Sequence, residues 1–167
     1  DGRVYGYWGF GRSCAAELDP ETMATVKEGT QVVEDMVSGH TQEGIFRFFE
    51  ASSMRKIADK YVFIYSRVTA DGEFGLPSVN YTLAYAYSDH PLGPFVQSDK
   101  KPIFSGEKSI DNTLFVDDDG KPYMFFDRFS PTDGLNIWSV ELEEDCLKVK
   151  PETYRFCIRA YQPWERK

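Results

Sequence analysis

The sequence has no cluster of basic residues, little histidine or cysteine, and no long hydrophobic run. Among its 167 residues, 19 are Lys or Arg and 27 are Asp or Glu, which gives a formal net charge of −8. Phosphate contacts need concentrated positive charge, so we expect no nucleic-acid partner. No apolar run approaches the ~18 residues of a membrane-spanning helix, and no signal peptide is visible. We therefore expect no membrane partner either.

The sequence has too few cysteines and histidines to predict a disulfide-stabilised fold or a metal site. The three cysteines, Cys14, Cys146 and Cys157, are widely spaced and odd in number, so they do not predict a disulfide framework. We interpret them as small buried hydrophobic residues. Two histidines, His40 and His90, are too few for most metal sites, and we expect no metal and no cofactor.

Aromatic residues, in contrast, are abundant, with 13 Phe, 10 Tyr and 3 Trp. Such rings suit β-rich cores and sugar-binding surfaces alike. They occur in short strand-like segments separated by turns, and no segment has a long helical apolar period. Many short, evenly spaced strands predict an all-β sandwich, barrel or propeller. The expected strands are 4–10, 13–18, 31–37, 52–58, 61–67, 81–88, 112–117, 122–129 and 135–142, followed by a short outer strand at 146–149.

Internal repetition favours a propeller among these folds. The segments that begin at Asp1 and at Asp119 share one order of parts: an Asp-Gly turn, an aromatic strand, an alternating strand ending in Glu-Leu, and a weak strand ending in Val-Lys. A repeated unit of three or four antiparallel strands is typical of a propeller blade. We therefore expect one partial propeller domain of about two to three blades. Its parts are an incomplete blade at 1–44, blades at 45–97 and 98–150, and the start of a further blade at 151–167.

Two carboxylates occupy equivalent places in the two more complete blades. Glu50 and Asp111 each stand just ahead of a strand that is expected to line the central channel. Cleavage of a glycosidic bond needs such a pair, in which one carboxylic acid protonates the leaving oxygen and the other activates water or attacks the sugar. Aromatic neighbours, Phe48 and Phe49, favour the neutral, proton-donating form of Glu50.

At these residues the sequence resembles glycoside hydrolase family 43, whose members are five-bladed β-propellers that cleave arabinose- and xylose-containing polysaccharides with inversion. FFEASSMRKIADKYVFIYS (48–66) is similar to the blade that carries the general acid, with Glu-Ala-Ser where the family often has Glu-Gly-Pro. SIDNTLFVDDDGKPYMFF (109–126) is similar to the blade that carries the acid's pKa modulator, with Ile-Asp-Asn in place of the frequent Ile-Asp-Pro. YAYSDHPLGPF (85–95) is similar to a blade-closing motif.

The resemblance implies that Glu50 is the general acid and that Asp111 is the pKa modulator that also orients substrate. The order of the blades departs from the family, because the modulating blade here follows the acid-bearing blade. The family's general base, an Asp of the first blade, has no clear match. We therefore expect a partial or recombined propeller, which leaves open a fragment, a chimera or one part of an assembly.

The predicted function is inverting hydrolysis of O-glycosidic bonds in a plant-type polysaccharide, with Trp8 and Tyr65 stacking on pentose rings. One alternative is a carbohydrate-binding propeller fragment without catalysis, and another is a scaffold for protein interactions. A partial propeller leaves sheet edges open, which favours pairing with other chains. We therefore also expect self-association that closes the propeller.

Overall fold

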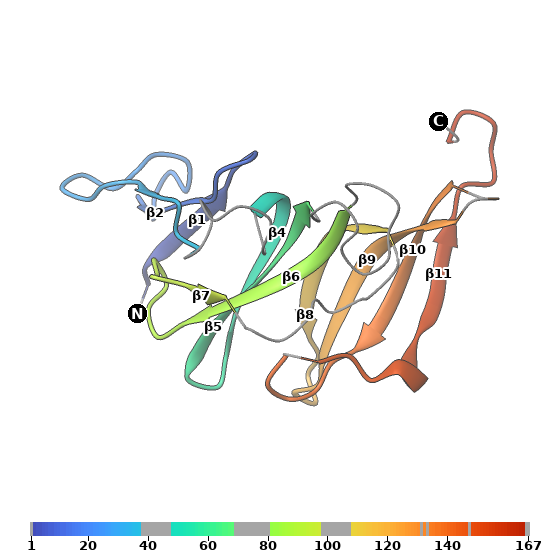
Figure 1. The fold of residues 1–167 in the computed structure, drawn as a ribbon. Helices are drawn as coiled ribbons and strands as arrows, with labels where there is room; N and C mark the ends of the chain where they lie inside the picture. Colours follow the sequence, from blue (N-terminus) through green and yellow to red (C-terminus); the bar gives the residue numbers. More distant parts are fainter. Residues whose placement is uncertain are drawn as a thin grey trace.

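The computed structural model describes residues 2–37, 48–68, 81–97, 108–130, 132, 134–146 and 148–165. Within these residues the strands form three antiparallel sheets, which stand side by side along the molecule (Figure 1). The described helical structure is one short 3-10 turn at Pro151–Thr153. No helix in the described part of the chain is long and apolar enough to cross a membrane.

The first sheet has the order β1-β2-β3, with β1 at Val4–Trp8, β2 at Cys14–Leu18 and β3 at Val33–Glu34. A buried carboxylate stabilises it, because Glu17 accepts hydrogen bonds from Arg3 (Nη2–Oε2 2.6 Å) and Lys27 (Nζ–Oε1 2.7 Å). These two hydrogen bonds lower the pKa of Glu17 to about 2. The ionised form of Glu17 therefore contributes to the stability of this sheet.

The second sheet has the order β4-β5-β6-β7. Its strands are β4 (Phe48–Ile57), β5 (Lys60–Val68), β6 (Tyr81–Ser88) and β7 (Val96–Gln97). Both faces are buried: Ile64 and Tyr85 pack toward the third sheet, while Phe63 and Ala84 pack toward the first. Since successive side chains of a strand point to opposite faces, β5 and β6 are apolar at nearly every position.

The third sheet has the order β11-β10-β9-β8. Its strands are β8 (Ser109–Val116), β9 (Pro122–Ser130), β10 (Gly134–Glu141) and β11 (Arg155–Arg159). One face packs on the second sheet through residues such as Leu114, Met124 and Val140. The other face, called the open face below, carries side chains that are 39% to 48% exposed: Phe115, Phe125, Phe129, Leu135 and Ile137.

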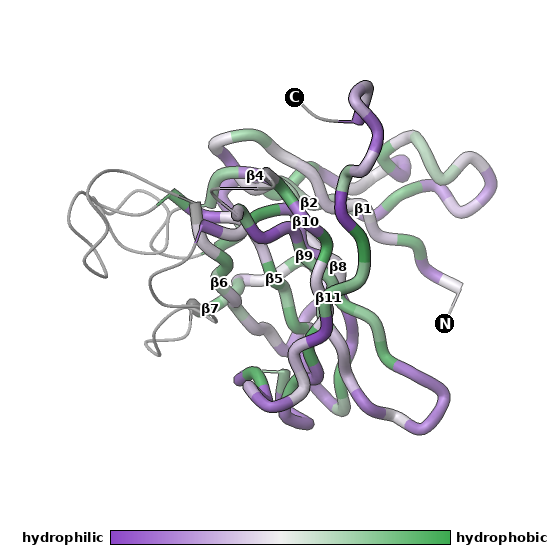
Figure 2. The backbone as a smooth tube through the Cα atoms, turned by 90° about the vertical axis from the view of Figure 1, so that its right-hand side faces the viewer, coloured by the Kyte–Doolittle hydropathy of each residue, from purple (hydrophilic) through white to green (hydrophobic). Residues whose placement is uncertain are grey.

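The three sheets are blades of a partial β-propeller, in agreement with the prediction. β4 and β8 each stand at one end of the strand order of their own sheet, and they contact each other. Hydrophobic stretches run along the interior strands, and hydrophilic stretches gather at the turns (Figure 2). The predicted strands at 61–67, 81–88, 122–129 and 135–142 are confirmed to within one residue.

Two predictions about the end of the chain are wrong. Residues 155–159 do not begin a further blade, because β11 pairs with β10 as the fourth strand of the third sheet. The segment 146–149, expected to be a short outer strand, forms only an isolated bridge between Val149 and Leu142. The outer edge of β10 is therefore available to pair with β11. All three cysteines are free, but only Cys146 is buried as expected; Cys14 is partly exposed, and Cys157 is exposed on β11.

Candidate active site

Glu50 lies inside β4 at a β-bulge, not ahead of the strand as expected. The pairing register between β4 and β5 shifts on both sides of Glu50, and the next residue, Ala51, has a φ of +29°. A bulge bends its strand and redirects a side chain, and bulges are frequent next to active sites. A left-handed backbone suits glycine, which accounts physically for the Glu-Gly-Pro form of the related motif. Here an alanine adopts it at a cost in backbone strain.

Asp111 occupies the corresponding position in the third sheet. It lies within β8, the register to β9 shifts between Ile110 and Thr113, and Asp111 itself has a φ of +57°. Aspartate is among the few residues other than glycine that adopt this conformation readily. Both inner strands are therefore bulged at their acidic residue.

Hydrogen bonds join the two bulges. Glu50 is paired in register with Ser66 on β5, and the Oγ atom of Ser66 accepts a hydrogen bond from the backbone N–H of Asp111 (3.2 Å). Beside it, the Nδ2 atom of Asn112 donates to the carbonyl oxygen of Ala51 (3.2 Å). The residues next to both acids are thus held to each other, which brings Glu50 and Asp111 to the same end of two neighbouring sheets.

Asn112 explains why this chain can depart from the Ile-Asp-Pro form of the motif. Its side chain is buried, and its amide nitrogen makes the hydrogen bond to Ala51, which a proline could not donate. A third hydrogen bond from the backbone N–H of Leu114 to Ser53 Oγ (2.9 Å) continues the contact along β4. The two inner strands are therefore connected by polar contacts as well as by apolar packing.

Two charged residues near the acids were missed by the sequence analysis. Asp127 on β9 is paired with Ile110, and its pKa is raised by burial and, to a lesser extent, by the negative charge of Asp111. Arg67 on β5 is fully buried, and its Nε atom donates to Thr82 Oγ1 (3.1 Å). The available signal was a charged residue within an aromatic strand, FFDRF for Asp127 and FIYSR for Arg67.

The predicted sugar-stacking residues fare differently. Tyr65 is 0% exposed, and its ring packs against Phe63 (5.5 Å between centroids) and Phe48 (5.6 Å), so its predicted contact with a sugar is wrong. Its position in a strand with two buried faces makes it a core residue. Trp8 is 43% exposed at the end of β1, and its predicted role stays a prediction.

The aromatic neighbours of Glu50 also have structural roles. Phe48 is buried among the apolar residues between the first and second sheets. Phe49 contacts Phe10, with 5.0 Å between the ring centroids. Among the described residues, no group of three or more His, Cys, Asp or Glu side chains could hold a metal ion. His40 lies outside the described residues.

Comparison with known proteins classifies the chain. The sequence profile described as Glycosyl hydrolases family 43 matches residues 21–166. This chain belongs to glycosyl hydrolase family 43. The acid-bearing bulges of β4 and β8 both lie within the matched region.

Individual relatives agree with this classification. A stretch of 46 residues, 28% of this chain and 14% of the relative, is 50% identical to Xylosidase/arabinosidase 43A of Humicola insolens. The structure of an endo-1,4-beta-xylanase from Bacteroides thetaiotaomicron is 28% identical, with a TM-score of 0.69, over 99% of this chain and 52% of the xylanase. A thermostable family-43 glycoside hydrolase is similar in fold, with 22% identity and a TM-score of 0.64 over 97% of this chain and 56% of that one. The chain spans about half the length of these solved relatives.

Proposed function

We propose that this chain carries the acid-bearing part of a glycoside hydrolase that cleaves O-glycosidic bonds in arabinose- or xylose-containing polysaccharides with inversion. The proposal is carried by one observation: the bulge at Glu50 and the bulge at Asp111 are hydrogen-bonded to each other through Ser66 and Asn112. Two carboxyl groups held at one end of neighbouring blades suit acid-assisted departure of a sugar.

Glu50 is the proposed general acid, and it would protonate the glycosidic oxygen as the bond breaks. Asp111 is the proposed pKa modulator of this acid and would also orient the sugar. This assignment is supported by the location of Asp111 on the neighbouring inner strand, with its backbone tied to the register partner of Glu50. A nearby negative charge favours the protonated form of an acid, which is the form that donates a proton.

Inversion also needs a general base on the other side of the sugar ring, and no residue of this chain matches the family's base. In inverting enzymes the acid and the base are roughly 6.5–9.5 Å apart, which leaves room for a water molecule. We propose that this carboxylate comes from outside the motifs identified here. Because the chain spans about half of its solved relatives, activity is proposed for the complete or assembled propeller.

The role of Glu50 is tested with two kinds of substrate. Glu50→Gln is expected to lower kcat/KM for arabino- and xylo-oligosaccharides by about 10²- to 10⁴-fold, the usual contribution of general acid catalysis. The loss should be much smaller for 4-nitrophenyl arabinofuranoside and xyloside, because 4-nitrophenolate leaves without needing a proton. Both rates are measured over a range of protein concentrations, since assembly could complete the site.

The matched control is Glu144→Gln, which removes an exposed carboxylate from the turn after β10 and should leave both rates unchanged. Equal rates for wild type and Glu50→Gln would remove Glu50 from the mechanism. Retention on arabinan or xylan in affinity electrophoresis without any turnover would favour the alternative, a carbohydrate-binding propeller fragment.

We also propose that the chain self-associates. The open face of the third sheet carries large apolar side chains, among them Phe125 and Ile137. In the second sheet, in contrast, the apolar side chains of β5 and β6 are buried on both faces. A second copy that covers the open face would remove this apolar surface from water, which is the main favourable contribution to association.

A further inference from the structure

The first and third sheets are two versions of one blade. Their central strand pairs, β1-β2 and β9-β10, match residue by residue. The matched cross-strand pairs are Tyr5–Glu17 with Tyr123–Glu141, Gly6–Ala16 with Met124–Val140, and Tyr7–Ala15 with Phe125–Ser139. The described sheets are therefore two blades of one kind and, packed between them, one blade of another kind, the second sheet.

The turns that follow these strands repeat the same contacts. Glu17 forms an ion pair with Lys27, whose backbone N–H donates to the carbonyl oxygen of Glu17 (3.0 Å). Glu141 forms an ion pair with Lys150, whose backbone N–H donates to the carbonyl oxygen of Glu141 (2.9 Å). Because register, hydrogen bonds and ion pairs agree, equivalent residues of the two sheets can be compared directly.

The face of the first sheet that packs on the second sheet is equivalent to the open face of the third sheet. The residues of this face on the first sheet are half-buried or buried: Tyr7, Ser13, Ala15 and Met36. Their equivalents on the third sheet are Phe125, Ile137, Ser139 and Ile158, in this order. Of these, Ile158 is 60% exposed. Thus one kind of face is covered in the first sheet and uncovered in the third.

The match extends to the outer strand of each sheet. The backbone N–H of Met36 donates to the carbonyl oxygen of Ser13 (3.4 Å), and Ile158 is paired in register with Ile137. Ser13 and Ile137 each lie two residues before a matched position, Ala15 and Ser139, and so share its face. The equivalence of the two faces therefore spans three strands.

The first sheet shows which surface covers such a face. Tyr7 lies against Phe63 of the second sheet, with 6.1 Å between the ring centroids, and its hydroxyl group donates to the carbonyl oxygen of Pro91 (2.7 Å). The carbonyl oxygen of Met36 accepts a hydrogen bond from the backbone N–H of Phe95 (3.0 Å). The open face of the third sheet is therefore suited to the same surface, the face of a second sheet that carries Phe63 and Phe95.

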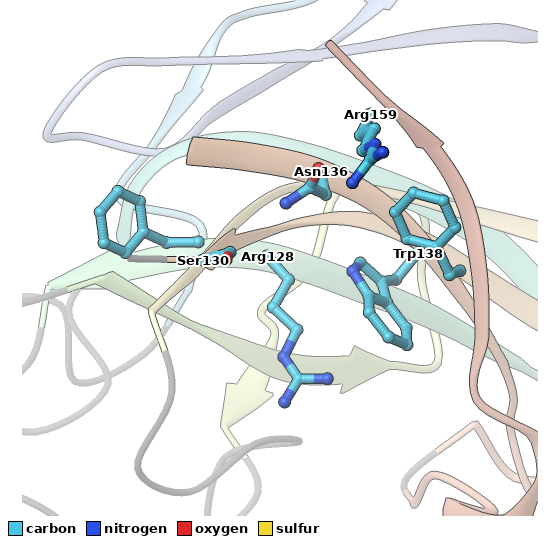
Figure 3. Close-up of a pocket in the computed structure, with 7 residues that line it drawn as sticks. Arg128, Ser130, Asn136, Trp138 and Arg159 are labelled. Atoms are coloured by element: carbon cyan, nitrogen blue, oxygen red, sulfur yellow. The ribbon is translucent and has the colours of Figure 1, made fainter. Parts of the chain in front are cut away.

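The two faces of the third sheet differ in its outer part. On the face that packs on the second sheet, the side chains beyond Trp138 are polar, and a pocket of about 390 Å³ lies beside them (Figure 3). These polar residues are consecutive cross-strand partners: Arg128, Asn136 and Arg159. At neighbouring positions the open face remains apolar, with Phe129, Leu135, Ile137 and Ile158. The packed face becomes polar where its packing ends, whereas the open face is typical of a surface that is covered across its full width.

We propose that the open face of the third sheet docks on the second sheet of another copy of this chain, in the place of that copy's own first sheet. Below, this is called sheet exchange. It rests on the self-association proposed above and states which surface of the second copy is used. Reciprocal exchange between two copies gives a ring of four sheets in which second and third sheets alternate, and propellers have about four to eight blades.

Two features favour the third sheet over the first in this place. At equivalent positions it has Ile137 instead of Ser13, so exchange removes more apolar surface from water. The third sheet also has the inner strand β8, which has no counterpart among the three described strands of the first sheet. Exchange therefore brings β8, with Asp111, beside the β4 strand that carries Glu50 in the other copy.

One position opposes sheet exchange. Asp127 follows Phe126 as Gly9 follows Trp8, and a Cβ atom at Gly9 would lie only 3.1 Å from the Cε1 atom of Phe48. A side chain in this place requires the Phe48 ring to move, and the carboxylate of Asp127 loses water, which costs free energy. We therefore expect a concentration-dependent equilibrium between the chain with its own first sheet and the exchanged dimer.

Photo-crosslinking identifies the surface that faces position 125. p-Benzoylphenylalanine replaces Phe125, and a mixture of ¹⁵N-labelled and unlabelled protein is irradiated at a concentration at which sedimentation velocity shows association. We expect crosslinks between copies that join position 125 to the second sheet near Phe63 or Pro91, because these residues contact Tyr7 within one chain. Mass spectrometry of the mixed-isotope peptides identifies the crosslinked residues.

A substitution far from the open face provides a second test. Ala15→Lys places a charge on the packed face of the first sheet and should release that sheet from the second, so the Kd of the dimer should fall by about tenfold or more. Val32→Lys adds the same charge to an exposed residue next to β3, and it should leave the Kd unchanged. Sedimentation velocity measures both values after circular dichroism has shown that the variants fold. If Ala15→Lys does not fold, the crosslinks decide alone.

Several results would overturn sheet exchange. Crosslinks from position 125 to the open face of the partner would show that two open faces pack together instead. A Kd that Ala15→Lys leaves unchanged or raises would have the same consequence. Association without any crosslink to the second sheet overturns sheet exchange alone, whereas a chain that is monomeric at every concentration overturns self-association as well. The Glu50→Gln rates enter none of these measurements, so the proposed hydrolysis is tested separately.

Discussion

The second and third sheets have the same number of strands and the same order, but they differ in how many of their faces are covered. The second sheet is packed between the first and the third, and its central strands are buried on both faces. The third sheet packs on the second with one face and exposes the other. Yet β9 and β10 carry large apolar side chains on both faces, as β5 and β6 do. The sequence of the third sheet is therefore typical of a blade that is packed on both faces, although only one of its faces is packed here.

The largest expected effect comes from removing matched phenylalanines from the two sheets. Phe63→Ala should lower the free energy of unfolding by about 3–5 kcal/mol, because the buried ring contacts Phe48, Tyr65 and Phe95 and its loss leaves a cavity. Phe125→Ala on the open face should cost about 0.5 kcal/mol or less at protein concentrations low enough for the chain to be monomeric. Denaturation in urea, followed by circular dichroism, measures both values. Equal losses would show that the open face is covered in solution.

Self-association tests the open face directly. Ile137→Lys should weaken association by about tenfold or more, because it places a charge at the centre of an apolar contact. Sedimentation velocity over a range of concentrations measures the change. Val116→Lys, an equivalent substitution at a similarly exposed residue near the end of β8, is the control. If the wild-type protein were monomeric at every concentration, self-association through the open face would be ruled out.

The first sheet packs on the other face of the second sheet. Its stability is expected to depend on pH because it contains Glu17. Since the pKa of Glu17 is lowered from 4.5 to about 2 in the folded chain, its ionised form stabilises the fold above pH 4.5, and this contribution is lost as the pH falls toward 2. Glu17→Gln should lower the melting temperature at pH 7 and remove this part of the acid dependence. Thermal unfolding at a series of pH values measures both effects.

An exposed ion pair of the same sheet provides the control for Glu17. Glu34→Gln removes a carboxylate that pairs with Arg12 (2.8 Å) at the surface, and it should change the melting temperature little. If the two variants had the same pH dependence of the melting temperature, the burial of Glu17 would not be the cause of the acid dependence.

The smallest expected effect concerns the bulge that the inner strands of both sheets share. Ala51→Gly should raise the free energy of unfolding by up to about 1 kcal/mol, because glycine adopts the positive φ without the steric cost that alanine has. Ala58→Gly, at a φ of +51° in the turn between β4 and β5, provides the same relief away from Glu50. Chemical denaturation should show similar gains, and a loss confined to Ala51→Gly would mean that the backbone at Glu50 is not strained.

Much of the fold could be predicted from the sequence because strand patterns are local. Alternation and turn residues located β5, β6, β9 and β10 to within one residue, and the repeated order of strands indicated blades. The place of β11 could not be predicted, because an isolated short strand does not reveal which edge it will join. Tyr65 was misassigned for a related reason: a tyrosine that faces a sugar and one that faces the core look the same in a strand with two apolar faces.

The sequence by itself determined the all-β class, the family, and the equivalence of Glu50 and Asp111, since each of these depends on residue types in a fixed local order. Only the tertiary structure decided that Ser66 and Asn112 join the two acid-bearing bulges, that Asp127 lies near Asp111, and that Arg128, Asn136 and Arg159 form one row. These contacts join residues that are far apart in the chain. Their hydrogen bonds and charges act only across distances that the packing of the sheets sets.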